Sequence, residues 1–177
     1  MVEFIIVFRE TLEASLIIGI LYTYLSKSNQ QSAIRQLWLG VTYALIASVI
    51  GSFLFQIFAG GFHGQAEKLF EGIVMIIAAI TLGTMIVWMA KNHNIADEIK
   101  SQAKSAIENK QLGYGILGLA FVSVFREGIE TILFLYGTMM KQGDLSIILS
   151  LAGGIIGTGM GYVIFVQGKK IPLKLFF

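Results

Sequence analysis

The stretch that decides the fold is "LGLAFVSVFREGIETILFLYGTMM", residues 117–140. It is long and apolar enough to cross a lipid bilayer as a helix, which takes about 20 residues, yet three charged side chains interrupt it in "FREGIE". Residues 4–25, "FIIVFRETLEASLIIGILYTYL", repeat this arrangement near the N-terminus. Because each charge inside a membrane costs about 2.5–3.5 kcal/mol, the two clusters predict a function that requires them.

The composition is that of a membrane protein. Of the 177 residues, 55% are hydrophobic and 14% are charged, whereas about 25% of the residues in an ordinary soluble domain are charged. The mean hydropathy is +0.75. Cysteine is absent, which excludes disulfides, thiolate metal ligands and a cysteine nucleophile. Because no nucleophile constellation or phosphate-binding loop is present either, we expect neither an enzyme nor a nucleic-acid-binding protein.

Five apolar runs are long enough to span a bilayer, and they cover residues 4–25, 37–59, 69–90, 113–136 and 145–166. Continuous runs without alternating polar residues favour helices over a β-barrel. We therefore predict an all-α, polytopic membrane protein with five complete transmembrane helices in one domain, residues 1–177. Residues 174–177 are expected to begin a sixth span, because their Lys-Leu-Phe also opens the third.

The basic residues predict the orientation of these spans. The segments after spans one, three and five carry nine lysines and arginines, and those after spans two and four carry two. Since basic flanks stay in the cytoplasm, we expect a multi-pass protein of the plasma or inner membrane with an extracytoplasmic N-terminus. The long connector 91–112 is then cytoplasmic.

This connector has apolar residues at every fourth position. They are Ile95, Ile99, Ala103 and Ile107. Such a pattern is typical of an amphipathic helix on the membrane surface. A solvated linker explains it equally well.

The charged motif is an internal repeat. "VFRETLE" from Val7 and "VFREGIE" from Val124 agree at five of seven positions, 117 residues apart. By the predicted orientation, the two copies run in opposite directions across the membrane. This predicts an inverted repeat of three-helix units, an architecture common in secondary transporters. Residues 1–90 form the first unit, and residues 113–177 form a truncated second unit.

Two spans also carry small residues four positions apart, which predicts close helix packing. They are Gly40, Ala44 and Ser48 in the second span, and Gly153, Gly157 and Gly161 in the fifth.

The charges of the two motifs are predicted to meet. Glutamates three positions apart share a helix face, and the two clusters lie at similar depths in antiparallel spans. The converging residues are Glu10, Glu13, Glu127 and Glu130, with Arg9 and Arg126. Carboxylates outnumber guanidiniums two to one, and carboxylate oxygens suit hard cations. We predict a metal site or a proton pathway; the alternative is a structural subunit whose spans are held by an interhelical salt-bridge clasp, which predicts matched charges.

Two Arg-Glu-x-x-Glu motifs in apolar spans of opposite direction resemble the iron permease family, the membrane subunits of oxidase-dependent ferric iron uptake in fungi and bacteria. The resemblance extends over the whole chain and includes "FEGIVMIIAAITLGTMIVWM" from Phe70 and "GKKIPLKLFF" from Gly168. It implies a permease of seven spans with iron as the transported substrate and no permanently bound cofactor. It assigns metal binding to Glu10, Glu13, Glu127 and Glu130, with Arg9 and Arg126 as accompanying charges.

The resemblance leaves several alternatives open. Ferric iron is the expected substrate, and a divalent-cation or lead permease on the same scaffold is the alternative.

The partners that the resemblance implies are the iron ion, the lipid bilayer and an extracytoplasmic oxidase or iron-delivery protein. A homo-oligomer is also expected, because a chain that ends at the start of a sixth span leaves apolar faces uncovered.

An outer vestibule is a further candidate. Glu71, Glu67 and His63 lie four residues apart at the outer end of the third span. If this segment is helical, the three side chains share a face and can pass metal to the deeper site. A solvated loop explains Glu67 and His63 equally well.

Overall fold

The computed structural model describes residues 1–60, 65–91, 95–108, 115–142 and 146–167, apart from some side chains near the helix ends and within residues 71–91. Every element within these ranges is an α-helix, which confirms the predicted all-α fold. The helices are α1 Val2–Lys27, α2 Gln31–Gly60, α3 Gln65–Lys91, α4 Ile95–Glu108, α5 Gly115–Gln142 and α6 Ile147–Gln167. The expected start of a sixth span, residues 174–177, lies outside the described residues.

The five long helices coincide with the five predicted spans but differ at their ends. The polar segment before residue 37 was predicted as a connector, and this was wrong for most of it, because α2 begins at Gln31. The turn between α1 and α2 is short. Asn29 adopts a positive φ of 56° there, a conformation that asparagine tolerates better than most residues. Arg35 therefore lies on a helix.

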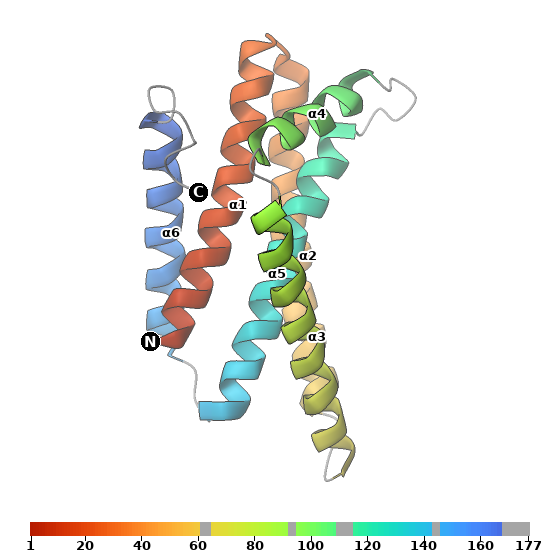
Figure 1. Ribbon diagram of the computed structural model, residues 1–177, viewed down its shortest axis with the longest axis vertical. Helices are drawn as coiled ribbons and strands as arrows, with labels where there is room; N and C mark the ends of the chain where they lie inside the picture. The colour runs from red at the N-terminus through yellow and green to blue at the C-terminus, as the bar shows by residue number, and fades with distance from the viewer. Residues whose placement is uncertain (61–64, 92–94, 109–114, 143–145, 168–177) are drawn as a thin grey trace.

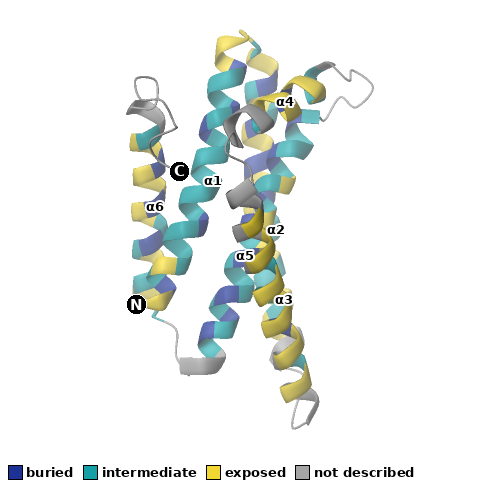
Figure 2. Ribbon diagram, viewed as in Figure 1, coloured by how far each residue is buried: buried dark blue, intermediate teal, exposed yellow. Residues whose placement is uncertain are grey.

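The flanks of the bundle are apolar. Among the described residues, the stretches Gln31–Ile57 and Ile147–Ile164 pass as membrane spans by length and composition, with mean hydropathies of 1.9 and 1.8. The apolar side chains of α2, α3 and α6 are largely exposed, as the yellow ribbon in Figure 2 shows. A surface of this kind suits lipid, since lipid requires no polar cover.

The two helices that carry the charged motif are neighbours and run in opposite directions (Figure 1). α1 packs most extensively with α6, and α5 packs most extensively with α2. α3 lies against α5. Each helix that carries the motif therefore packs against a different apolar helix, α1 against α6 and α5 against α2.

Small residues allow these helix pairs to approach closely. A Cβ atom added to Gly157 of α6 would lie 2.8 Å from the carbonyl oxygen of Phe8 on α1. A Cβ atom added to Gly40 of α2 would lie 2.5 Å from the carbonyl oxygen of Leu117 on α5. Both contacts are with backbone, which cannot swing away, so the packing role predicted for the two small-residue stripes is confirmed.

These contacts predict the effect of alanine in α6. Gly157→Ala should lower the free energy of unfolding by about 1–3 kcal/mol, because its methyl group meets the backbone of α1. Gly159→Ala is the matched control, because a Cβ there has nothing within 4 Å. Thermal unfolding of the protein in detergent, followed by helical circular dichroism, measures both. Equal melting temperatures for the two variants would contradict the close contact.

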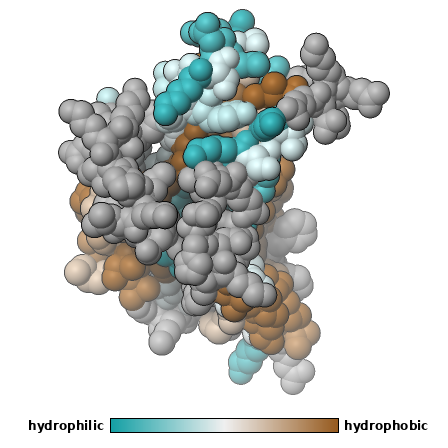
Figure 3. Space-filling model, turned by 45° about the horizontal axis from the view of Figure 1, so that its top comes forward, coloured by the Kyte–Doolittle hydropathy of each residue, from teal (hydrophilic) through white to brown (hydrophobic). Residues whose placement is uncertain are grey.

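α4 covers one end of the bundle. The structure confirms that this segment is a helix with an apolar face and not a solvated linker, whereas its location on the membrane surface stays a prediction. Its apolar residues Ile99, Ala103 and Ile107 pack against a core that includes Leu21 and Ile116, and Ala103 is fully buried. In the view of Figure 3, hydrophilic residues gather at the end of the molecule that carries α4. The apolar face of α4 therefore packs against α1 and α5.

Candidate metal centre

The contact between α1 and α5 brings three carboxyl groups together. Glu10 of α1 and Glu127 and Glu130 of α5 each offer one oxygen atom, and these atoms all lie within 4.8 Å of one another. The residues are buried, with exposed fractions of 2%, 6% and 3% respectively. Three buried carboxylates at this spacing form a candidate cation site.

Local sequence explains how α5 presents two of these groups. Glu127 and Glu130 are three residues apart and thus share one face of the helix. Between them, Gly128 lets α2 approach, since a Cβ there would lie 2.8 Å from the Cβ of Ser48. The α2–α5 packing therefore occurs directly beside the carboxyl cluster and fixes the position of α5.

Each arginine forms an ion pair within its own helix. The Nε of Arg9 donates to Oε1 of Glu13 at 3.0 Å. The Nε of Arg126 donates to Oε1 of Glu130 at 2.9 Å. A pair between residues of one helix does not tie α1 to α5, so these two ion pairs give no support to the interhelical clasp.

Arg9 makes two further contacts. Its Nη2 lies 3.5 Å from Oε1 of Glu10, and its guanidinium carbon lies 6.0 Å from the ring centroid of Phe134 on α5. The second contact is at the outer limit of a cation–π interaction. Arg9 thus places positive charge beside the cluster and against the facing helix.

Several carboxylate oxygens of the cluster lack hydrogen bonds. Among the described residues, both oxygens of Glu10 and the Oε2 atoms of Glu127 and Glu130 are buried with no hydrogen-bond partner. A buried acceptor without a partner costs about 1–3 kcal/mol, and more when it is charged. A cation held between the three residues would relieve part of this cost, because each residue can offer it one oxygen.

The structure brings three of the four predicted ligands together and leaves the fourth outside the group. Glu10, Glu127 and Glu130 converge as expected, whereas Glu13 is not part of that group and instead accepts a hydrogen bond from Arg9. Glu67 and Glu71 lie on α3, so their predicted helical spacing is confirmed, but their side chains lie outside the described part of the chain. His63 also lies outside it. The outer vestibule stays a prediction.

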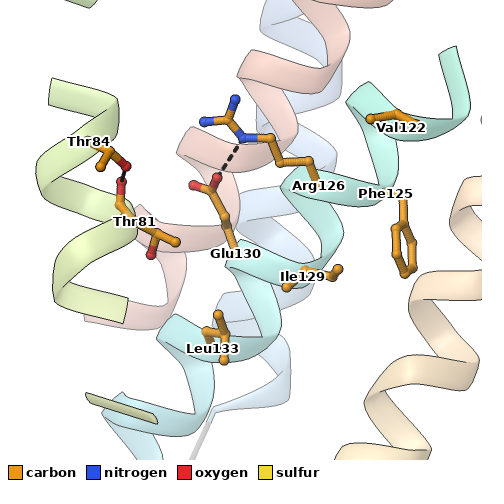
Figure 4. Close-up of a pocket in the computed structure, with 8 residues that line it drawn as sticks. All are labelled: Thr81, Thr84, Val122, Phe125, Arg126, Ile129, Glu130 and Leu133. Carbon is orange, nitrogen blue, oxygen red and sulfur yellow. Dashed lines mark hydrogen bonds and ion pairs between the residues drawn. The ribbon is translucent and has the colours of Figure 1, made fainter. Parts of the chain in front are cut away.

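A pocket of about 530 Å³ adjoins the cluster between α3 and α5 (Figure 4). Arg126 and Glu130 line it from α5, and Thr81 and Thr84 line it from α3. The remaining lining residues are Val122, Phe125, Ile129 and Leu133. Neither threonine was predicted from the sequence. The sequence feature that could have indicated them is a pair of hydroxyl groups three positions apart, on one face of an apolar span.

The sequence of the whole chain matches a known family. The family model described as the Iron permease FTR1 family matches residues 1–177. The chain belongs to the FTR1 iron permease family. The resemblance inferred from the two Arg-Glu-x-x-Glu motifs is thereby confirmed.

Two relatives of this FTR1-family chain are bacterial. It is 31% identical over 186 residues to the ferrous iron permease EfeU of Yersinia pestis, covering 99% of this chain and 64% of the relative. It is 30% identical over 183 residues to the ferrous iron permease EfeU of Escherichia coli O6:H1 (strain CFT073), covering 99% and 65%. The chain thus spans a little under two thirds of the length of these relatives. No solved structure matches it.

Proposed function

We propose that this FTR1-family chain imports iron across the cell membrane and that Glu10, Glu127 and Glu130 bind the ion during transport. The observation that carries the proposal is the convergence of three buried carboxyl groups from two helices, with oxygens that lack hydrogen-bond partners among the described residues. The family and the names of the relatives, which are iron permeases, support iron as the cargo.

The chemistry of the cluster favours a hard cation. All of its ligands are carboxylate oxygens, which prefer hard ions over soft ones. With Glu13, the two motifs hold four carboxylates against two guanidiniums, a formal surplus of two negative charges, so the site suits a multivalent cation and charge balance does not by itself select a trivalent one. Because ferric iron is a harder cation than ferrous iron, we propose ferric iron as the bound ion, although the relatives are named ferrous iron permeases.

The arginines have a complementary role in this proposal. Arg9 and Arg126 hold the carboxylates while no metal is present, which limits the repulsion between them. When iron binds, the ligands must be deprotonated, so protons leave the site. Glu13 can then join as a fourth ligand if Arg9 releases it.

Crystals of the protein grown with iron test the site directly. An anomalous peak at the iron edge is expected between Glu10, Glu127 and Glu130, and it should disappear in Glu127→Gln. Gallium, a redox-inert ion of the same charge and similar size as ferric iron, should displace the peak if ferric iron is bound. A peak elsewhere in the bundle, with this cluster empty, would refute the proposed site.

We further propose that the five long helices span the membrane as an inverted repeat. If α1 corresponds to α5 and α2 to α6, the pair α1–α6 corresponds to the pair α5–α2. These are the two most extensive helix contacts, and both use small residues. The antiparallel directions of α1 and α5 also support this relation.

The orientation of the repeat can be tested with single cysteines, because the chain has none. Ser101→Cys, on the exposed face of α4, should resist an impermeant thiol reagent in intact cells and react after lysis. Gly64→Cys, in the segment between α2 and α3, should react in intact cells. The reverse labelling pattern would contradict the orientation that the nine-to-two distribution of basic residues predicts.

A further inference from the structure

The ion pair between Arg126 and Glu130 occupies one of the two oxygens that Glu130 could offer to a metal ion. Oε1 of Glu130 accepts a hydrogen bond from Arg126, while Oε2 of Glu130 is buried without a hydrogen-bond partner among the described residues. A cation that binds both oxygens of Glu130 must displace the guanidinium from Oε1. The guanidinium therefore needs a second position that satisfies its N–H groups.

The pocket beside Glu130 offers such a position. Figure 4 shows Thr81 and Thr84 of α3 facing Arg126 and Glu130 of α5 across it. The side chain of Arg126 is 51% exposed, so it is not held by packing. A pocket of about 530 Å³ has ample room for a guanidinium group.

The hydroxyl groups of this pocket suit a donor. The Oγ1 of Thr81 donates to the carbonyl oxygens of Ile77 and Ala78, at 3.0 and 2.9 Å. The Oγ1 of Thr84 donates to the carbonyl oxygen of Thr81 at 2.9 Å. Because each hydroxyl has one hydrogen atom and has used it, each oxygen can act toward another group only as an acceptor. A guanidinium has five N–H donors and no acceptor, so the two groups are complementary.

We propose that Thr81 and Thr84 receive the guanidinium of Arg126 when a cation binds Glu130, and that they are positioning residues of the transport site. The inference rests on the proposed function, because it requires Glu130 to bind the ion. The threonines act through Arg126. They lower the cost of breaking the Arg126–Glu130 pair and so raise the affinity for the ion without touching it.

The same chemistry disfavours an anion in this pocket. An anion needs donors, and the hydroxyl hydrogens of both threonines are already bound to backbone carbonyls. Arg126 would be left to bind such an anion without help from α3. The acceptor character of the α3 wall therefore favours an internal partner, the arginine.

Valine and serine replacements on the full-length protein test this role. Valine keeps the shape of threonine but removes the acceptor, whereas serine keeps the acceptor. The double variant Thr81→Val/Thr84→Val should bind iron about tenfold more weakly, equivalent to about 1.4 kcal/mol, and should raise the KM of uptake with little change in the maximal rate. Thr81→Ser/Thr84→Ser should stay within about twofold of the parent in affinity.

Thr158→Val is the matched control. Thr158 makes the same kind of bond to the helix backbone, to the carbonyl oxygen of Gly154 at 2.8 Å, but it lies on α6, away from Arg126. Its replacement should leave both iron affinity and uptake unchanged. Equal loss of affinity in the valine and serine double variants would overturn the inference, because it would indicate altered packing rather than a lost acceptor.

Glu127→Gln, measured in parallel, separates this inference from the proposed function. If Glu127→Gln loses iron binding while the valine double variant binds normally, the carboxylate site stands and the role of the threonines is refuted. If Glu127→Gln binds iron normally, the site itself is refuted, and with it the basis for the inference.

Discussion

Glu127→Gln is expected to reduce iron uptake per molecule by about 100-fold or more. The change keeps the size of the side chain and removes one of three buried anionic ligands. Loss of groups that merely orient metal ligands already costs about 10- to 100-fold in affinity or activity, and Glu127 lies within the cluster itself. Uptake of radioactive iron by proteoliposomes containing the full-length protein, normalised to protein content, measures the effect. Glu10→Gln should behave in the same way.

The stability of these variants should not fall, since each replaces a buried ionisable group, whose desolvation is costly when it is charged, with a neutral one. Glu3→Gln is the control, because Glu3 is also a buried glutamate of α1. It pairs with the N-terminal amino group at 2.8 Å and lies outside the cluster, so its replacement should leave uptake intact. If Glu127→Gln and Glu10→Gln transported normally, the three carboxylates would not be the iron pathway. If uptake fell only in step with protein level, the salt-bridge clasp would be favoured.

Arg126→Gln should have the largest effect on folding. It leaves the carboxylate of Glu130, 3% exposed, beside two other carboxyl groups without its ion-pair partner. Removing one member of a buried pair costs about 3–5 kcal/mol, and we expect about 2–3 kcal/mol here because the side chain of Arg126 is half exposed. Chemical unfolding of the purified protein in detergent should show the loss.

A second change should restore the fold. In Arg126→Gln/Glu130→Gln, both members of the pair are neutral, so stability should return to within about 1 kcal/mol of the parent. Iron uptake should stay low, because a ligand is missing. Arg35→Gln, at an exposed position of α2, is the control and should change neither property. A double variant that remains as unstable as Arg126→Gln would show that Arg126 stabilises the fold in some way other than through Glu130.

The sequence by itself determined the fold class and indicated which charged residues belong to the candidate site. Long apolar runs without water to bond their backbone must form helices, and this predicted all five long helices. The helical repeat of 3.6 residues per turn places Glu127 and Glu130 on one face. The two copies of Arg-Glu-x-x-Glu predicted that α1 and α5 meet, and they indicated the family.

Only the tertiary structure decided which of these groups meet and at what distance. Helical periodicity defines a face, but it does not set how far a helix rotates or how closely its neighbour approaches. Those quantities depend on packing at Gly128, Gly40 and Gly157 against other helices.

The same packing decided features with no counterpart in local sequence. It brought Glu10 together with Glu127 and Glu130 of the facing helix, while Glu13 stayed outside this group. It also placed the threonines of α3 across from Arg126. Such contacts between residues far apart in the chain depend on how all the helices fill space together, and no local sequence pattern contains that information.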